Sequence, residues 1–254
     1  MTSPDLARPQ ARSGLLELQG LRRRLRTCAV VGGSGILAQH PRGKEIDAAE
    51  AVFRVNNCPV RGFEHMAGGK TTFRFLNSPR SLTWAKDVKA KKTIPELEGN
   101  EHVIIWGSSD TRERLASYVE RQPNSTVVKA DTSFRKHCAG KAFWADEEVA
   151  QHKKQSGAKL FEITFGFEAV AHALFACERV SIYGFFLDHA DAQRQTNAVG
   201  GKAMATPYHY YENQTFDKSA KDPWRPWTYS YHNFELEHSK YKQLEKACWL
   251  SVRI

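Results

Sequence analysis

The sequence predicts a single-domain α/β fold in which a mostly parallel central sheet is flanked by helices. Three observations support this prediction. Short apolar runs recur along the chain, as expected of buried parallel strands. Helical patterns separate these runs, and such alternation favours parallel pairing. The first apolar run ends in a cluster of glycines, which is typical of a tight turn between a strand and a helix.

Each element follows from a local pattern. The predicted strands are apolar runs bounded by polar or turn residues: 28–31, 51–55, 71–76, 102–107 and 180–185. Helices are predicted over 110–121, 166–177 and 233–250, and in the second of these apolar residues recur at spacings of three and four. Ser108 or Ser109 provides the N-cap of the first of these helices.

The domain organisation is simple. Residues 1–26 form a predicted N-terminal extension or stem remnant, and residues 27–254 form one folded domain without an internal boundary. Residues 190–206 and 215–230 lack a hydrophobic pattern and are expected to form loops of the kind that move over active sites. No apolar run reaches the length of about 18 to 20 residues that spans a bilayer. The N-terminus also lacks the pattern of a signal peptide, as a truncated chain would.

The chain has a formal charge of +9, which favours an anionic partner. A nucleic acid and a nucleotide sugar both fit that charge. Zinc-ligand spacing, an RNP motif and a helix-turn-helix signature are all missing from the sequence, so no nucleic-acid partner is expected. The five cysteines include no CxxC pair, which argues against a structural zinc site, and their odd number leaves at least one unpaired. Two tripeptides fit the N-glycosylation pattern, at Asn124 and at Asn213.

The glycine turn Gly32-Gly33-Ser34-Gly35 is the first candidate binding element. Glycines allow a tight turn and let backbone N–H groups face a phosphate. An ordinary strand–helix turn explains the glycines alone equally well. The dinucleotide motif G-x-G-x-x-G is incomplete because Ala38 stands at its last position, although alanine is sometimes tolerated there, so a nicotinamide enzyme stays open at this point.

Further motifs follow this turn in a fixed order. The stretch after it contains Glu45-Ile46-Asp47, Arg54-Val55-Asn56, Gly62-Phe63-Glu64 and Gly68-Gly69-Lys70-Thr71-Thr72. Farther along are Gly166, then Cys177 eleven residues later, then Tyr183-Gly184-Phe185, His209-Tyr210-Tyr211-Glu212, and His232 with Glu237. Together with the segment 28–35, this set resembles the large, small, third and very small sialylmotifs of the eukaryotic sialyltransferase family, glycosyltransferase family 29.

The resemblance implies a GT-A-like, Rossmann-type catalytic domain that works without the usual metal-binding Asp-x-Asp, and the sequence contains no Asp-x-Asp. It implies inverting transfer of sialic acid from CMP-sialic acid to a glycan hydroxyl, without a cofactor, on the lumenal side of the Golgi. A membrane would be involved only through an anchor that this chain does not contain. The resemblance also implies a disulfide between Cys28 and Cys177. A link closing so long a loop contributes about 4 to 5 kcal/mol before strain and requires an oxidising compartment.

The resemblance assigns roles to individual residues. His232 corresponds to the general base that takes the proton of the acceptor hydroxyl, and His209 to the residue that stabilises the departing phosphate. The expected contacts to the CMP donor are Gly33, Ser34, Gly35, Asn56, Phe165, Gly166 and Tyr210. Core packing is an equal alternative for Tyr210. Glu237 either caps backbone N–H groups or orients His232.

Two of the motifs depart from the family pattern. Gly33 replaces an asparagine that contacts the donor, and Thr164-Phe165 replace Ser-Thr before Gly166. These changes leave open a related donor such as CMP-Kdo, or a catalytically silent protein that binds a CMP-sugar. Acceptor contacts are expected in variable loops, at residues 75–100 and 190–230. The acceptor glycan and the linkage cannot be read from the sequence.

Overall fold

The computed structural model describes residues 24–97, 99–140, 142–156, 161–185, 207, 209–212, 232 and 234–253. These residues contain a seven-stranded sheet in the order β5-β4-β3-β2-β1-β6-β7, and every neighbouring pair is parallel. The strands are β1 (Leu25–Val31), β2 (Ala51–Val55), β3 (Phe73–Leu76), β4 (His102–Ile105), β5 (Thr126–Lys129), β6 (Cys177–Tyr183) and β7 (Ser251–Arg253). The predicted α/β class with a parallel sheet is confirmed.

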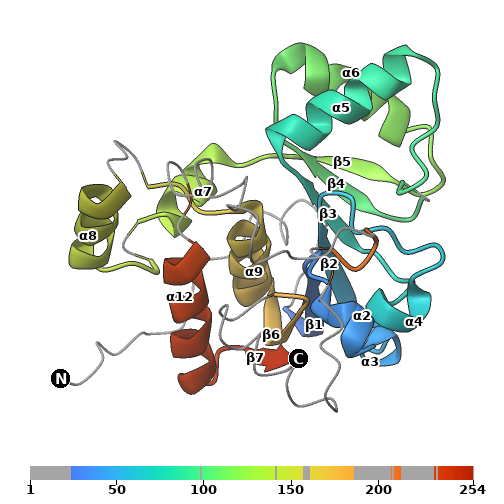
Figure 1. The fold of residues 1–254 in the computed structure, drawn as a ribbon. Coiled ribbons are helices and arrows are strands. Elements are labelled where there is room, and N and C mark those ends of the chain that lie inside the picture. Colours follow the sequence, from blue (N-terminus) through green and yellow to red (C-terminus); the bar gives the residue numbers. More distant parts are fainter. Residues whose placement is uncertain are drawn as a thin grey trace.

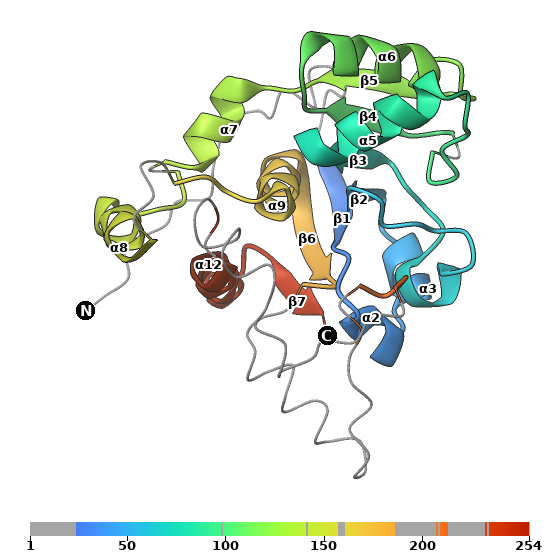
Figure 2. The ribbon, with the colours of Figure 1, turned by 45° about the horizontal axis from the view of Figure 1, so that its top comes forward.

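Helices cover both faces of this sheet (Figure 1, Figure 2). They are α2 (Ile36–Gln39), α3 (Gly43–Asp47), α4 (Glu64–Ala67), α5 (Ser78–Lys89), α6 (Ser109–Val119), α7 (Thr132–Cys138), α8 (Asp146–Ser156), α9 (Phe165–Ala176) and α12 (Phe234–Lys246). Along β1, Cys28 and Val30 face the core under α9, whereas Ala29 and Val31 face the core under α2 and α3. The period-two alternation of a strand thus divides the apolar residues between two helical layers.

The helix α9 forms the centre of the larger core. All of its residues from Phe167 to Ala176 are buried, as expected of a helix enclosed between a sheet and an outer layer. Phe167 stacks on Tyr241 of α12, with ring centroids 5.6 Å apart. The helix α12 therefore lies outside α9 and completes that layer.

The observed bounds refine the predicted ones. β2 has the predicted bounds, whereas β1 begins at Leu25 because Leu25 and Thr27 pair with the first residues of β6. The sequence did not predict β5 or β7. The segment 75–100, expected as a loop, contains the helix α5, whose N-cap Asn77 accepts a hydrogen bond from the backbone N–H of Arg80.

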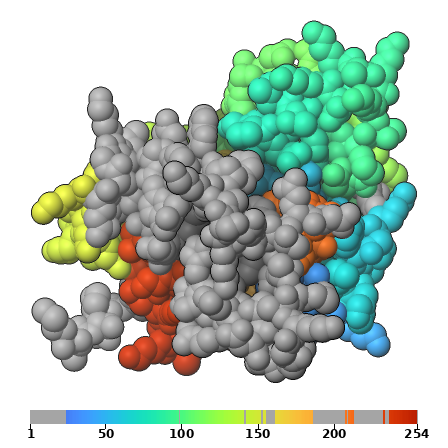
Figure 3. Space-filling view, viewed as in Figure 1, coloured from blue at the N-terminus to red at the C-terminus, as the bar shows by residue number. Residues whose placement is uncertain are grey.

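The helices α5 and α6 form a lobe at one end of the molecule, over β3 and β4 (Figure 3). Residues 1–23 of the predicted extension lie outside the described residues, as do the predicted loops 190–206 and 215–230. Among the helices that the structure describes, none combines the length and the apolar character needed to cross a membrane.

Candidate active site

The chain reverses its direction of winding at β1. Each strand from β2 to β5 adds to one side of the sheet, and β6 then pairs with the other side of β1. In open α/β sheets, ligands bind outside the carboxyl ends of the strands at such a switch point. The segments that follow Val31 of β1 and Tyr183 of β6 therefore mark the place where a site is expected.

The glycine turn lies at this switch point and is held against the end of β6. The backbone N–H of Gly32 donates to the carbonyl of Tyr183 at 2.8 Å, and that of Ser34 donates to the carbonyl of Gly184 at 3.1 Å. A Cβ atom on Gly32 would lie 2.5 Å from the Gly184 carbonyl oxygen. Glycine is required here because the two motifs approach each other through their backbones.

The end of the turn packs against the third motif. A Cβ atom on Gly35 would lie 1.9 Å from the carbonyl oxygen of Pro207. Ser34 forms an antiparallel bridge with His209, and the hydroxyl of Ser34 accepts a hydrogen bond from the backbone N–H of Ile36 at 3.2 Å. Ser34 and Gly35 thus fasten residues far along the chain onto the glycine turn.

His209 lies directly over Gly33. A Cβ atom on Gly33 would be 2.9 Å from Cδ2 and 3.6 Å from Nε2 of the imidazole. The backbone N–H of Tyr210 donates to the Gly33 carbonyl at 3.0 Å, and this bond fixes the height of the neighbouring His209 ring above the turn. The space left by the missing side chain at position 33 is therefore the space into which His209 fits.

Glu212 and Tyr211 also hold the His209 ring, at its Nδ1 edge and on one face. Its Nδ1 atom lies 2.8 Å from Oε2 of Glu212, so an ion pair forms whenever the ring is protonated; the contact lacks the alignment of a regular hydrogen bond. The ring stacks on Tyr211, with centroids 4.9 Å apart and an interplanar angle of 6°. These contacts turn the Cδ2–Nε2 edge toward the glycine turn.

Tyr210, expected to contact the donor or to fill the core, is placed in the core. Its side chain is buried among Phe63 and Tyr211, and its hydroxyl donates to the Pro59 carbonyl at 2.7 Å. Burial raises the pKa of this hydroxyl far above its usual range. The packing alternative accounts for these contacts, because the hydroxyl is already used by the protein.

Asn56 follows the carboxyl end of β2, next to the glycine turn. Its backbone has φ of 55°, a left-handed conformation that asparagine tolerates better than most residues. Its side-chain oxygen accepts a hydrogen bond from the backbone N–H of Asn77 at 3.0 Å. Since a backbone N–H must meet an oxygen, this bond fixes the orientation of the amide and leaves its NH₂ group, a pure donor suited to a phosphate, for a ligand.

Much of the large motif has a scaffold role. The fully buried Arg54 donates to the backbone carbonyls of Ala67, Gly68 and Lys70 at 2.8 to 2.9 Å. Asp47 accepts from the backbone N–H of Lys70 at 2.9 Å. A buried guanidinium is costly unless its donors are hydrogen-bonded, and here carbonyls of one loop accept from its Nε and Nη2 atoms. These residues shape the loop before β3 rather than a ligand site.

The N-terminus of α9 brings the small motif to the same edge of the sheet. Thr164 is the N-cap, and its hydroxyl accepts from the backbone N–H of Phe167 at 3.0 Å. A Cβ atom on Gly166 would lie 3.1 Å from the ring of Phe185, and one on Gly32 would lie 3.3 Å from the same ring. The phenyl ring of Phe185 therefore stands between the glycine turn and the start of α9.

Glu237 of α12 binds this N-cap. Its two carboxyl oxygens accept hydrogen bonds from the backbone N–H and the hydroxyl of Thr164, each at 2.6 Å. Burial raises the pKa of Glu237 to about 7, against the opposing effect of the Thr164 hydrogen bonds. Of the two roles that the sequence left open, the contacts favour a capping role at the start of α9.

His232 is hydrogen-bonded to Glu162, which lies two residues before the N-cap Thr164. Its Nδ1 atom lies 2.9 Å from the carbonyl oxygen of Glu162. A carbonyl only accepts, so this bond requires the proton on Nδ1 and leaves the lone pair on Nε2. Burial lowers the pKa of His232, and the charge of Arg135 lowers it further, while Glu162 acts in the opposite direction. The ring is therefore a neutral imidazole with a defined basic nitrogen.

Arg135 of α7 is a site neighbour that the sequence did not predict. Its guanidinium donates to the carbonyl of Ile163 and to the buried carboxylate of Glu168, and it lies 4.5 Å from the ring centroid of Phe165. An acidic residue on a mostly apolar helix signals that Glu168 needs a cationic partner, but no pattern in the sequence identifies which one. Phe165 thus contacts a fixed cation at the start of α9.

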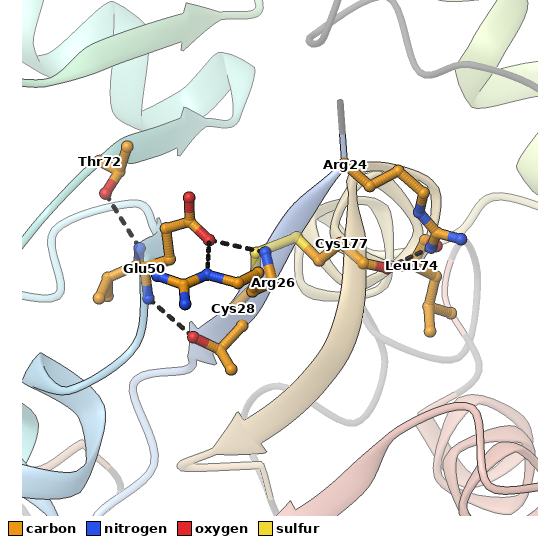
Figure 4. The surroundings of a disulfide bond; sticks show 9 residues. Arg24, Arg26, Cys28, Glu50, Thr72, Leu174 and Cys177 are labelled. Atoms are coloured by element: carbon orange, nitrogen blue, oxygen red, sulfur yellow. Dashed lines mark hydrogen bonds and ion pairs between the residues drawn. A yellow bond between two sulfur atoms is a disulfide. The ribbon is translucent and has the colours of Figure 1, made fainter. Parts of the chain in front are cut away.

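The predicted disulfide is present. Cys28 of β1 and Cys177, the first residue of β6, form the bond, with Cα atoms 6.1 Å apart. Figure 4 shows Arg24 reaching the end of α9 beside it, where its guanidinium donates to the Leu174 carbonyl at 2.7 Å. The remaining cysteines, Cys58, Cys138 and Cys248, are unbridged.

A doubly wound α/β fold with a glycine turn at its switch point and two held histidines beside it is typical of enzymes that bind nucleotides. The sequence matches glycosyltransferase family 29 (sialyltransferase) over residues 7–249, and the chain belongs to that family. The resemblance seen in the motifs is confirmed.

Similar proteins come from plants and animals. The chain is 28% identical over 245 residues to sialyltransferase-like protein 2 of Oryza sativa subsp. indica, covering 89% of this chain and 54% of the relative. It is 25% identical to the beta-1,6-galactosyltransferase GALT29A of Arabidopsis thaliana, covering 87% and 51%. A human alpha-2,6-sialyltransferase that acts on a sialylated galactosyl-N-acetylgalactosaminide is 28% identical, covering 76% and 62%. The chain thus spans about half to three-fifths of these relatives.

Solved structures share the fold. The crystal structure of a mammalian sialyltransferase superposes with a TM-score of 0.58 at 20% sequence identity, covering 96% of this chain and 74% of that one. The same comparison holds for a mammalian sialyltransferase in complex with Gal-beta-1-3GalNAc-ortho-nitrophenol, with a TM-score of 0.57 at 18% identity.

Proposed function

We propose that this chain is the catalytic domain of an inverting glycosyltransferase that transfers sialic acid from CMP-sialic acid to a glycan hydroxyl. The observation that carries the proposal is the pair of histidines fixed in different ways at one edge of the sheet. His232 presents a basic Nε2 atom because Glu162 holds its Nδ1–H. His209 lies over the glycine turn with Glu212 at its other edge.

The reaction assigns one task to each histidine. The acceptor oxygen attacks the anomeric carbon, and His232 Nε2 takes the proton of that hydroxyl. The bond between the anomeric carbon and the phosphate oxygen breaks, and the departing CMP keeps the electron pair. His209, at the turn expected to hold the phosphate, stabilises the charge that develops there. A departing phosphate carries its own negative charge, so this step requires no separate general acid.

The remaining predicted residues fit the donor side. The turn Gly33-Ser34-Gly35 and the NH₂ group of Asn56 supply the phosphate and ribose contacts in this proposal. Phe165 and Gly166 at the start of α9 line the sugar side. Metal-independence also remains a proposal; it rests on the missing Asp-x-Asp and predicts unchanged transfer in a chelator such as EDTA.

The proposed location is the lumenal face of the Golgi, with any membrane attachment supplied by a segment outside the described residues. The disulfide between Cys28 and Cys177 supports it, because such bonds persist in oxidising compartments. The glycan acceptor is also a proposal, and one similar solved structure contains a Gal-beta-1-3GalNAc derivative.

A second candidate keeps the scaffold and changes the donor sugar. The hydroxyl of Thr164 is used by Glu237 and by the backbone of α9, and Phe165 next to it has no hydrogen-bonding group. The donor's sugar carboxylate would find no free side-chain hydroxyl at these two positions. CMP-Kdo carries the same carboxylate as sialic acid, so the missing hydroxyl does not favour one of these two donors over the other. A neutral donor sugar needs no partner for a carboxylate, and one of the similar proteins is named a galactosyltransferase.

One assay separates these candidates. The purified disulfide-bonded chain is incubated with CMP-sialic acid, CMP-Kdo and UDP-galactose, and release of the nucleotide is measured with and without a glycan array as acceptor. The first proposal expects release from CMP-sialic acid. Release from another donor alone supports the second candidate. Saturable CMP binding in calorimetry without turnover of any donor would identify a silent binding protein.

A further inference from the structure

The turn that joins α6 to β5 carries the tripeptide Asn124-Ser125-Thr126. It fits the acceptor pattern for N-linked glycosylation, in which the middle residue is any except proline. The pattern by itself is short, so its placement in the fold decides whether it is usable. The second match, which begins at Asn213, lies outside the described residues.

The placement of Asn124 suits a bulky modification. The residue is exposed, as are Pro123 before it and Thr126 after it. Its φ is 50°, a left-handed turn conformation that directs the chain around a tight corner, and the backbone N–H of Ser125 closes the turn onto the carbonyl of Gln122 at 3.3 Å. Because the Asn124 side chain is exposed, a glycan on it displaces no packed side chain.

The side-chain amide keeps its structural contact after modification. The Nδ2 atom of Asn124 donates one hydrogen bond, to Oδ1 of the exposed Asn100 at 2.9 Å. A primary amide carries two hydrogens, and attachment of a sugar replaces one of them. The other hydrogen remains available to Asn100, so glycosylation and the folded turn are compatible.

The turn also lies away from the candidate active site. All seven strands are parallel, and β5 starts at Thr126, so this turn is at the edge of the sheet where strands begin. The glycine turn, Asn56 and the start of α9 lie where strands end. In addition, β5 is the outermost strand of the sheet on this side, next to β4 alone among the described strands. A glycan here lies at the opposite edge of the sheet from the glycine turn and the start of α9.

We propose that Asn124 is an N-glycosylation site of this protein. Its Nδ2 atom forms a bond to the anomeric carbon of an oligosaccharide carried on a lipid diphosphate. The bond from that carbon to the phosphate breaks, the phosphate keeps the electron pair, and one amide proton is released. The disulfide supports this assignment independently, since it requires the oxidising secretory compartments that also contain N-linked glycosylation.

The test uses the whole chain, secreted from a eukaryotic host behind a cleavable signal. Peptide mass spectrometry on the secreted protein first verifies the Cys28–Cys177 disulfide. Deglycosylation with peptide-N-glycosidase F in ¹⁸O-water then converts each glycosylated asparagine into labelled aspartate. The expected result is label at Asn124 and complete loss of that glycan in N124Q and in T126A.

The conservative variant T126S keeps the acceptor pattern and is expected to keep the glycan, which separates loss of the pattern from loss of the fold. N213Q serves as the matched control for the second tripeptide. Secreted, disulfide-bonded protein with unmodified Asn124 would overturn the proposal, even if Asn213 carries a glycan. Nucleotide release by N124Q is expected to equal that of the unmutated chain, so this test is independent of the proposed function.

Discussion

The two histidines of the candidate site show how partners assign different tasks to one residue type. His209 stands beside a carboxylate, Glu212, and over a glycine, Gly33, with its side chain 30% exposed. His232 is hydrogen-bonded instead to a backbone carbonyl, that of Glu162. A carboxylate partner suits a ring that carries positive charge, whereas a carbonyl that accepts from Nδ1 places the lone pair of a neutral ring on Nε2. The comparison predicts a base on one side and a charge stabiliser on the other.

The largest effect is expected from removal of the base. H232A should lower kcat for transfer by about 10² to 10⁴, the usual contribution of a general base, while CMP still binds in calorimetry. H65A is the matched control, because His65 is exposed on α4 and lies outside the third and very small motifs, which contain His209 and His232. Full activity in H232A would remove His232 from the mechanism.

Loss of His209 is expected to be nearly as large. H209A should reduce kcat by about 10² to 10³, the range for one preorganised stabilising group. G33A should produce part of this loss with His209 still present, because the added Cβ would lie 2.9 Å from the ring. If Gly33 acts through His209, the double variant G33A/H209A is no worse than H209A. Additive losses would show that Gly33 acts by another route.

The pH profile tests the neutral state of His232. Because burial and Arg135 lower its pKa, the acid limb of kcat/KM should lie below the ordinary histidine value of about 6.5. Removing the cation together with its buried partner, in R135M/E168Q, should move this limb to higher pH. The paired change avoids leaving Glu168 buried and uncompensated. An unchanged limb would mean that His232 does not set it.

The smallest effect concerns Glu237 and appears in stability. Its pKa is about 7 in the folded chain and about 4.5 when unfolded, so the folded state binds more protons between these values. The contribution of Glu237 is fully present below about pH 4.5 and is lost as pH rises through about 7. Chemical denaturation should therefore show E237Q gaining stability relative to the unmutated chain as pH rises across this window.

The alanine variant separates this charge effect from the capping contact. E237A should be less stable than E237Q by about 1 to 3 kcal/mol at every pH, because the backbone N–H of Thr164 loses its partner only in the alanine variant. If E237A and E237Q behave alike, the hydrogen bonds to Thr164 contribute little. If neither shows a pH trend, the proton uptake of Glu237 on folding is absent.

The sequence predicted most completely the elements that carry motifs or long apolar runs. β2 and α9 follow from such runs, and the disulfide between Cys28 and Cys177 follows from the family resemblance. β5 was missed because only Val128 of its four residues is fully buried, which leaves little pattern to detect. The helix α5 carried a start signal, Asn77 followed by Pro79, but its weak apolar pattern did not distinguish it from a loop.

Contacts between distant residues were the hardest to predict. Nothing in the local sequence links Glu237 to Thr164 or Arg135 to Ile163, because these pairs form only when three helices pack around one segment. Tyr210 illustrates the same limit. A tyrosine in a motif suggests a ligand contact, and only the position of Pro59 shows where its hydroxyl goes.

The approach of Gly32 to Gly184 has a consequence for how such chains can vary. A side chain on either residue would meet the carbonyl of the other, at 2.5 Å in one direction and 2.8 Å in the other. A change at one position cannot be rescued by shortening the other, since both are already glycine. In a library of all single substitutions selected for folding, these two positions should tolerate no other residue, and no second substitution at the partner should restore either.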